Sequence, residues 1–263
     1  MKPNYKNWVP KGMVIAACVI TAVLAAALAA VCMTGFPEGT ARTVTIWILA
    51  VLTAVGILLS AFYVNLYTTF SYDGKKQLSR RIIGKIADYV VLPENGVGLD
   101  VGCGSGALTI ACAKKNPQGS MVGLDRWGRE YASFSMKLCE DNARIEGVGD
   151  NTSFRQGDAC KLDYPDEFFD AVTSNYCYHN IPSKDRQAII LETLRTLKKG
   201  GTFAIHDEFT RSKYGDTDQL LKKLRDLGYE KAELLDTSNG LFMTHKEAAP
   251  LCLVGSGLLV GKK

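Results

Sequence analysis

Three glycines at two-residue spacing separate two apolar segments of the chain. The run 97–101 predicts a buried strand, and the segment 108–111 begins a predicted helix. The glycines between them are Gly102, Gly104 and Gly106. Glycine lets the backbone turn sharply, and the free N–H groups at a helix start can face a ligand. The pattern therefore predicts a nucleotide-binding turn, but it also fits the dinucleotide pattern G-x-G-x-x-G/A.

The other predicted strands end beside side chains that can hydrogen-bond a ligand. In open α/β sheets, ligands bind at the carboxyl ends of the parallel strands. Asp125 suits a ribose because one carboxylate can accept hydrogen bonds from both vicinal hydroxyls. Dinucleotide sites share that feature, so Asp125 does not discriminate between them. The predicted strands and their end residues are 97–101 with Asp100, 119–125 with Asp125, 152–156 with Asp158, 169–175 with Asn175, and 202–205 with Asp207.

Helical patterns alternate with these strands, which predicts a mostly parallel sheet covered on both faces. Ser183 is a candidate N-terminal cap for the helix predicted over 183–197, and Gly200-Gly201 would end that helix. The tail predicts two more strands, 231–235 and 250–260, around a turn at Asn239-Gly240. The predicted helices span residues 76–91, 108–115, 129–145, 183–197 and 218–227.

Two long uncharged segments precede this domain. Each is predicted to span a membrane, at about 12–34 and 44–66, since roughly 20 apolar residues cross the hydrocarbon layer. A cleaved signal peptide is the alternative for the first segment, but its apolar part is too long and a second segment follows directly. Alanines at four-residue spacing would let the two helices approach closely. They are Ala22, Ala26 and Ala30.

Basic residues flank this hairpin on both outer sides. Lys2, Lys6 and Lys11 precede it, and a basic cluster at 75–85 follows it, whereas the short connection offers only Arg42. Both flanks, and with them the catalytic domain, should therefore be cytoplasmic. The cluster at 75–85 suits either anionic lipid head groups or a solvated helix face.

Charge and cysteine usage narrow the function classes. The chain has 31 basic and 27 acidic side chains, of which four basic and one acidic lie in residues 1–70. The remaining 27 basic and 26 acidic side chains leave the rest of the chain nearly neutral. Nucleic-acid binding would need a basic face, so nucleic acid is not an expected partner. The eight cysteines form no C-x-x-C pair and no zinc-like spacing, which predicts no metal site and suits a reducing compartment.

Five motifs in order resemble the class I S-adenosylmethionine-dependent methyltransferases, from about residue 71 to 263. The resemblance implies a Rossmann-like seven-stranded α/β sheet, mostly parallel with an antiparallel last strand, and it implies S-adenosyl-L-methionine as cofactor and S-adenosyl-L-homocysteine as product. It leaves out the two predicted transmembrane helices, so the chain is predicted to form a membrane anchor at 1–70 and a methyltransferase domain at 71–263. The matching motifs are residues 99–106, 123–125, 157–162, 166–172 and 197–201.

The same resemblance implies roles for the strand-end residues. Asp100 and the glycine turn would hold the methionine part of the cofactor, Asp125 the ribose, and Asp158 the adenine amino group. Trp127 could stack on the adenine or belong to the core or surface, and Tyr72 could form part of a lid. The predicted cofactor-binding set is Asp100, Gly102, Cys103, Gly104, Gly106, Asp125, Arg126, Asp158, Ala159, Asn175 and Tyr72.

Catalytic candidates stand after the fourth and fifth strands. His179 is the favoured base or acceptor-orienting group, with a structural hydrogen bond as its alternative role, and Asp207 is a second candidate base. Tyr176 and Tyr178 could line the pocket and face the sulfonium cation. His245 is expected in a hairpin, away from the reaction.

The sequence as a whole predicts a membrane-anchored methyltransferase acting on a small or lipid-like acceptor by in-line displacement. Holding donor and acceptor about 3–3.5 Å apart in a dry pocket supplies much of such catalysis. Two alternatives remain open: a non-catalytic cofactor-binding membrane module, and a nicotinamide-dependent oxidoreductase that uses the same glycine turn.

Overall fold

The computed structural model describes residues 1–34, 36–128 and 133–263. The chain divides into two compact units. One contains Asn7–Ser79, and the other joins Met1–Lys6 to Arg80–Lys263. The first six residues therefore fold with the second unit, although the whole of the first unit separates them from it in the sequence.

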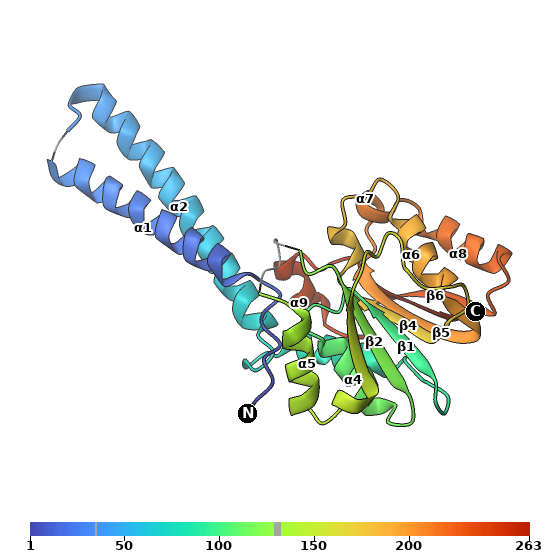
Figure 1. Ribbon diagram of the computed structural model, residues 1–263. Coiled ribbons are helices and arrows are strands. Elements are labelled where there is room, and N and C mark those ends of the chain that lie inside the picture. Colours follow the sequence, from blue (N-terminus) through green and yellow to red (C-terminus); the bar gives the residue numbers. More distant parts are fainter. Residues whose placement is uncertain (35, 129–132) are drawn as a thin grey trace. The chain divides into compact units, whose positions relative to one another are not determined.

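The larger unit is built on a seven-stranded sheet with the order β3-β2-β1-β4-β5-β7-β6 (Figure 1). Strands β1 to β5 are parallel, and β7 is antiparallel to both of its neighbours, β5 and β6. This confirms the predicted sheet, and it differs from the 3-2-1-4-5-6 order of dinucleotide-binding domains. The strands are β1 (Val97–Val101), β2 (Ser120–Asp125), β3 (Thr152–Gln156), β4 (Phe169–Asn175), β5 (Leu197–Glu208), β6 (Lys231–Asp236) and β7 (Ser256–Lys262).

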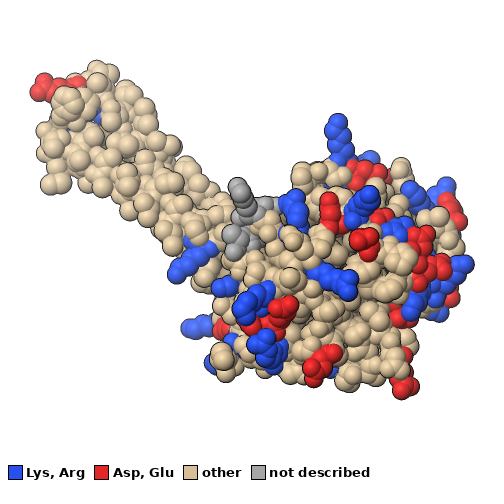
Figure 2. Space-filling view, viewed as in Figure 1, with Lys and Arg blue, Asp and Glu red and all other residues tan. Residues whose placement is uncertain are grey.

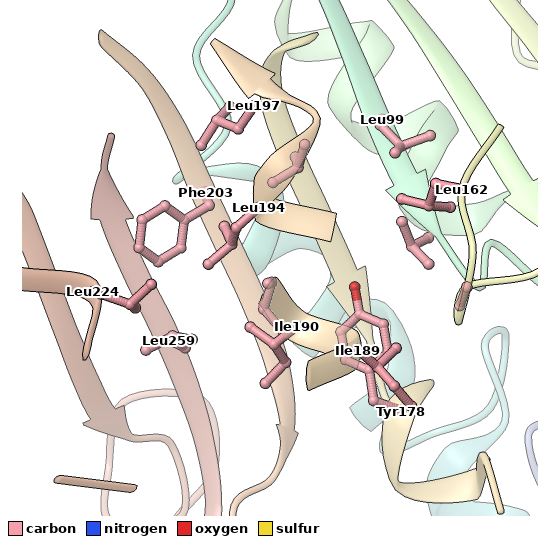
Figure 3. Close-up of a cluster of buried hydrophobic side chains, with 14 of the residues drawn as sticks. Leu99, Leu162, Tyr178, Ile189, Ile190, Leu194, Leu197, Phe203, Leu224 and Leu259 are labelled. Carbon is pink, nitrogen blue, oxygen red and sulfur yellow. The ribbon is translucent and has the colours of Figure 1, made fainter. Parts of the chain in front are cut away.

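Helices cover both faces of this sheet, with α4 and α5 on one side and α6 and α8 on the other (Figure 1). A buried cluster joins β1, β5 and β7 to α6 and α8, where Phe203 of β5 packs with Leu194 and Leu224 (Figure 3). Burying each such side chain stabilises the fold by about 1.5–3 kcal/mol. The helices are α3 (Leu78–Ala87), α4 (Ala107–Lys115), α5 (Met136–Ile145), α6 (Arg186–Arg195), α7 (Arg211–Tyr214), α8 (Thr217–Asp226) and α9 (His245–Ala248).

The cap and the end of α6 differ from the prediction. Asp185, not Ser183, caps the helix, and its Oδ1 accepts a hydrogen bond from the Ala188 N–H at 3.0 Å. Gly200 and Gly201 lie inside β5 instead of ending the helix. A Cβ on Gly201 would stand 2.8 Å from the Asp170 carbonyl oxygen, so glycine permits the close approach of β4 there.

Two other predicted elements begin later than expected. Part of the helix expected over 129–145 lies outside the described residues, and α5 begins at Met136, capped by the Ser135 hydroxyl. The last strand begins at Ser256 rather than at Pro250, which lies in a short 3-10 helix, η4 (Ala249–Leu251). His245 is not in a hairpin, because it begins α9, whose Thr244 and Glu247 form a capping box.

The smaller unit contains the helices α1 (Lys11–Thr34) and α2 (Gly39–Phe70). The predicted alanine contact is wrong, because Ala22, Ala26 and Ala30 are exposed. The helices meet instead at Thr21, whose hydroxyl lies 3.0 Å from the Ser60 hydroxyl, and at Gly56, where a Cβ would stand 2.7 Å from Thr21 Oγ1. The apolar surface of the pair carries almost no charged side chains along its length (Figure 2).

Candidate functional site

The glycine turn is fastened to the end of β2. The N–H groups of Gly102 and Cys103 donate to the Leu124 carbonyl at 2.7 and 3.1 Å, and the Gly104 N–H donates to Asp125 Oδ2 at 2.8 Å. Gly102, Gly104 and Gly106 all have positive φ, between 56° and 80°, which side chains rarely adopt. The carboxyl ends of β1 and β2 are thus brought together as predicted.

The other side of the turn approaches the segment that follows β4. A Cβ on Gly102 would stand 2.3 Å from Cys177 Sγ, so only glycine fits between β1 and this segment. Cys103 is buried, and burial raises the pKa of its thiol well above the usual range. That thiol therefore stays neutral and acts as a small apolar side chain.

Asp125 retains hydrogen-bonding capacity for a ligand. Its Oδ1 accepts the Trp127 N–H at 2.7 Å, and the Trp127 indole N–H donates to the Gly104 carbonyl at 2.9 Å. Each carboxylate oxygen has two lone-pair sites, so each can accept one hydroxyl besides its present donor. This arrangement fits a ribose diol, and it fixes Trp127 beside the glycine turn.

Asp100 is a buried carboxyl group with one unpaired oxygen. Oδ2 accepts the Thr109 hydroxyl at 2.6 Å, whereas Oδ1 has no hydrogen-bond partner within the described part of the chain. Burial raises the pKa of Asp100 to about 7, against the hydrogen bonding of Thr109, and the negative charge of Asp125 adds to the rise. Such a carboxylate would be stabilised by a cation, which fits the ammonium group of a methionine moiety.

Asn175 is held in one orientation by a chain of buried groups. Its Oδ1 lies 2.8 Å from His206 Nδ1, and His206 Nε2 lies 2.9 Å from the Thr237 hydroxyl. Burial lowers the pKa of His206 to about 3, so the ring is neutral at physiological pH. Nδ1–H therefore donates to Asn175, Nε2 accepts from Thr237, and the Asn175 amide NH₂ remains for another partner.

His179 and Asp207, the two candidate bases, are bonded to each other. His179 Nδ1 lies 2.5 Å from Asp207 Oδ1, and the His179 backbone N–H donates to Asp207 Oδ2 at 3.2 Å. The Asp207 side chain is fully buried, whereas the His179 ring is 14% exposed. Burial acts to raise the pKa of Asp207, but His179 outweighs it by hydrogen bonding and charge and holds the pKa below its usual range.

The two predicted pocket tyrosines differ in their surroundings. Tyr176 has φ of 49° and its hydroxyl lies 2.8 Å from the Ser256 hydroxyl, while its ring contacts those of His179 and His206. Burial raises the pKa of Tyr176, so its hydroxyl is protonated. Tyr178 does not line a pocket, because it is fully buried in the core, with its hydroxyl 2.8 Å from that of Thr193.

The remaining predicted residues lie at the expected strand ends or in the other unit. Asp158 follows β3 and accepts the Cys160 N–H at 2.9 Å, and Ala159 beside it is buried. Arg126 is exposed after β2, and its carbonyl accepts from Gln156 at 3.1 Å. Tyr72 belongs to the unit Asn7–Ser79, and its role as a lid stays a prediction.

Sequence reasoning missed the partners that orient these groups. They come from distant segments or from helix faces, and no local pattern marks them, since a threonine or serine at such positions is common. They are Thr109 beside Asp100, Thr237 beside His206, Ser256 beside Tyr176, and Asn142 beside Ser105 of the glycine turn.

Comparison with known families agrees with this geometry. Residues 99–205, from β1 into β5, match the family described as "Methyltransferase domain". This part of the chain is similar to a methyltransferase domain. The match includes the glycine turn, Asp125, Asn175 and His179, and it confirms the predicted resemblance.

Curated relatives of this methyltransferase domain include enzymes of quinone methylation. Demethylmenaquinone methyltransferase of Lactobacillus johnsonii is 31% identical over 143 residues, which cover 54% of this chain and 52% of that protein. 2-Phytyl-1,4-naphtoquinone methyltransferase of Synechococcus elongatus is 34% identical over 110 residues, which cover 41% of this chain and 44% of that protein. The chain thus spans about half the length of the curated relatives it matches.

Solved structures share the fold at low sequence identity. A geranyl diphosphate methyltransferase in complex with geranyl diphosphate and sinefungin has a TM-score of 0.56 and 12% identity, over 74% of this chain and 82% of its own. The [4+2]-cyclase SpnF has a TM-score of 0.55 and 23% identity, over 72% of this chain and 82% of its own. The fold is therefore shared with a protein described as a cyclase, so the site must decide the chemistry.

Proposed function

We propose that this chain is a membrane-anchored S-adenosylmethionine-dependent methyltransferase that methylates a small or lipid-like acceptor, with quinone-type rings as the favoured class. The observation that carries the proposal is the His179–Asp207 pair, in which His179 follows β4 and Asp207 lies near the carboxyl end of β5. The glycine turn packs against Cys177, two residues before His179. A proton acceptor thus stands close in sequence and space to the predicted cofactor site.

The cofactor would supply an electrophilic methyl group on a sulfonium. Asp100 would hold its ammonium group, Asp125 its ribose hydroxyls, and Asp158 with Ala159 its adenine. Two features support this fit: the buried, unpaired Asp100 Oδ1 and the positive-φ glycine cradle, where a Cβ would clash with Cys177. Arg126 and Asn175 are the further polar groups at the strand ends.

The His179–Asp207 pair suits an acceptor that must lose a proton, such as a phenolic or enolic ring. Asp207 accepts from His179 Nδ1, which leaves Nε2 as the nitrogen that can accept a proton. The buried Asp207 carboxylate also stabilises the imidazolium that forms. Tyr176 is T-shaped against His179, with ring centroids 5.9 Å apart, and it bounds the same region with a neutral ring.

The membrane anchor is supported by α1 and α2. Both are long and apolar enough to cross a bilayer. Of the residues in the most apolar stretch of each helix, 0% are buried in α1 and 6% in α2, whereas a core helix of a soluble protein is mostly buried. Residues 1–6, which precede α1, fold with the methyltransferase domain, which follows α2. Two crossings would return the chain to the side on which it started, and the basic flanks favour the cytoplasm as that side.

A transfer assay tests the proposal. Full-length protein in detergent is incubated with S-adenosylmethionine labelled in the methyl group and with a total lipid and metabolite extract. We expect label in the organic phase, carried on a quinone-type ring, and none with the Asp125→Ala variant, which should lose cofactor binding. Cofactor binding without turnover on any extract would instead support the non-catalytic module. Absence of binding by the wild-type protein would overturn the assignment.

A further inference from the structure

The N-terminal segment, residues 1–6, is held by hydrogen bonds against the methyltransferase domain, beside α5 (Figure 1). The side-chain amide of Asn142, in α5, bonds both the N–H and the carbonyl group of Asn4. Its Oδ1 accepts the Asn4 N–H at 2.7 Å, and its Nδ2 donates to the Asn4 carbonyl at 3.0 Å. Asn142 is 1% exposed, so this amide pairs with a specific backbone instead of with water.

The same segment also reaches the glycine turn. Ser105, between Gly104 and Gly106, donates its hydroxyl to the Tyr5 carbonyl at 2.8 Å. The Ser105 carbonyl accepts the second hydrogen bond of Asn142 Nδ2, at 3.0 Å. The hydroxyl and the carbonyl of Ser105 are therefore both bonded, and the residue is 4% exposed.

Tyr5 anchors the segment independently of these bonds. Its side chain is 5% exposed, and its hydroxyl donates to Glu146 Oε1 at 3.0 Å, just beyond the end of α5. A buried tyrosine removes a large apolar area from water and its hydroxyl needs a partner, and Tyr5 meets both conditions on this domain.

We propose that residues 1–6 are a positioning element of the cofactor site, which holds the glycine turn in its binding conformation through Ser105 and Asn142. This rests on the proposed placement of the cofactor at that turn. Because Gly104 and Gly106 have no Cβ, the free turn can adopt many alternative conformations. Bonds that fix Ser105 between them therefore remove part of the ordering free energy from binding. The site is thus completed by a segment that precedes the whole membrane hairpin in sequence.

The test compares cofactor affinity in full-length variants, measured by titration calorimetry with S-adenosylhomocysteine in detergent. Asn142→Leu removes all three bonds at nearly constant volume, and a deletion of residues 2–6 removes the segment itself. We expect each to raise Kd about tenfold, which is the effect of one or two lost hydrogen bonds. Glu140→Ala is the control on the same helix, because the Glu140 side chain is exposed on α5, and its Kd should stay within about twofold of wild type.

The double variant separates positioning from general damage. Because Asn142 acts partly through the segment and partly through its own bond to the Ser105 carbonyl, adding Asn142→Leu to the deletion should raise Kd by clearly less than the product of the two single effects, whereas independent effects would multiply. Amide hydrogen exchange across residues 102–106 should quicken in the deletion variant without ligand. Wild-type Kd in both single variants, or a multiplicative double variant, would overturn the positioning role. A wild-type protein that binds no cofactor would instead overturn the proposed function.

Discussion

His206 Nδ1 lies 2.8 Å from Asn175 Oδ1, so a fully buried imidazole orients the polar side chain at the end of β4. His206 Nε2 is bonded to the Thr237 hydroxyl, so both ring nitrogens are used. Since the ring is neutral, its tautomer is determined by these two partners. The Asn175 amide therefore presents its NH₂ group, and not its oxygen, to whatever binds at this strand end.

Replacing His206 should disturb both the fold and the site. His206→Leu leaves the Asn175 oxygen and the Thr237 hydroxyl without their partner, and we expect a loss of about 2–4 kcal/mol in the free energy of unfolding. Because the pKa of about 3 lies below the ordinary 6.5, the wild-type protein should lose stability as pH falls from 6.5 toward 3. His206→Leu should lose this part of the pH dependence, measured by thermal unfolding across that range.

The exposed His245 is the matched control for that measurement. His245→Ala removes a histidine from the start of α9 and should leave both stability and its pH dependence as in the wild-type protein. Equal pH profiles for the wild-type protein and His206→Leu would contradict the buried, neutral His206.

Asp100 predicts a pH dependence of cofactor binding. Its pKa of about 7 in the ligand-free protein lies above the ordinary 3.8, so ionisation of the folded state is disfavoured and ligand-free stability should fall as pH rises from 3.8 through 7. A cationic ligand binds the ionised carboxylate. Affinity for S-adenosylmethionine should therefore rise up to about tenfold per pH unit below pH 7 and level off above it.

Asp100→Asn tests that explanation directly. The variant should bind more weakly above pH 7 and show little pH dependence between 5.5 and 8.5 in calorimetry, because no charge develops at this position. A variant that keeps the wild-type slope would show that another group titrates.

Gly102 should tolerate no side chain. Gly102→Ala places a Cβ 2.3 Å from Cys177 Sγ in a backbone with φ of 76°, so we expect at least a tenfold weaker Kd for the cofactor. Gly147 has a similar φ of 75° and nothing within 4 Å of its Cβ position, so Gly147→Ala measures the backbone strain alone. Removing the obstructing sulfur with Cys177→Ala should restore part of the affinity of Gly102→Ala, and no restoration would contradict the steric explanation.

Local patterns predicted the strands and the glycine turn because the residues that form them are adjacent in sequence. The same patterns could not choose between Ser183 and Asp185 as the cap of α6, because both residue types cap helices. They also could not join His179 to Asp207, since that pair depends on how the segment after β4 packs against the end of β5. The bond between Asn4 and Asn142 spans 138 positions, and no periodicity connects residues at that distance.

The His179–Asp207 pair makes the last prediction. Asp207→Asn keeps the shape of the side chain but removes the charge that stabilises an imidazolium, so kcat should fall about 10²–10⁴-fold for an acceptor that loses a proton. His179→Gln should lower kcat to a similar degree, and the double variant should be no slower than either single one, because the two residues act as a unit. Affinity for S-adenosylhomocysteine should change less than about threefold in all three, as neither residue is assigned to the cofactor. Wild-type kcat in His179→Gln would show that the acceptor needs no base and that the pair holds only the segment after β4.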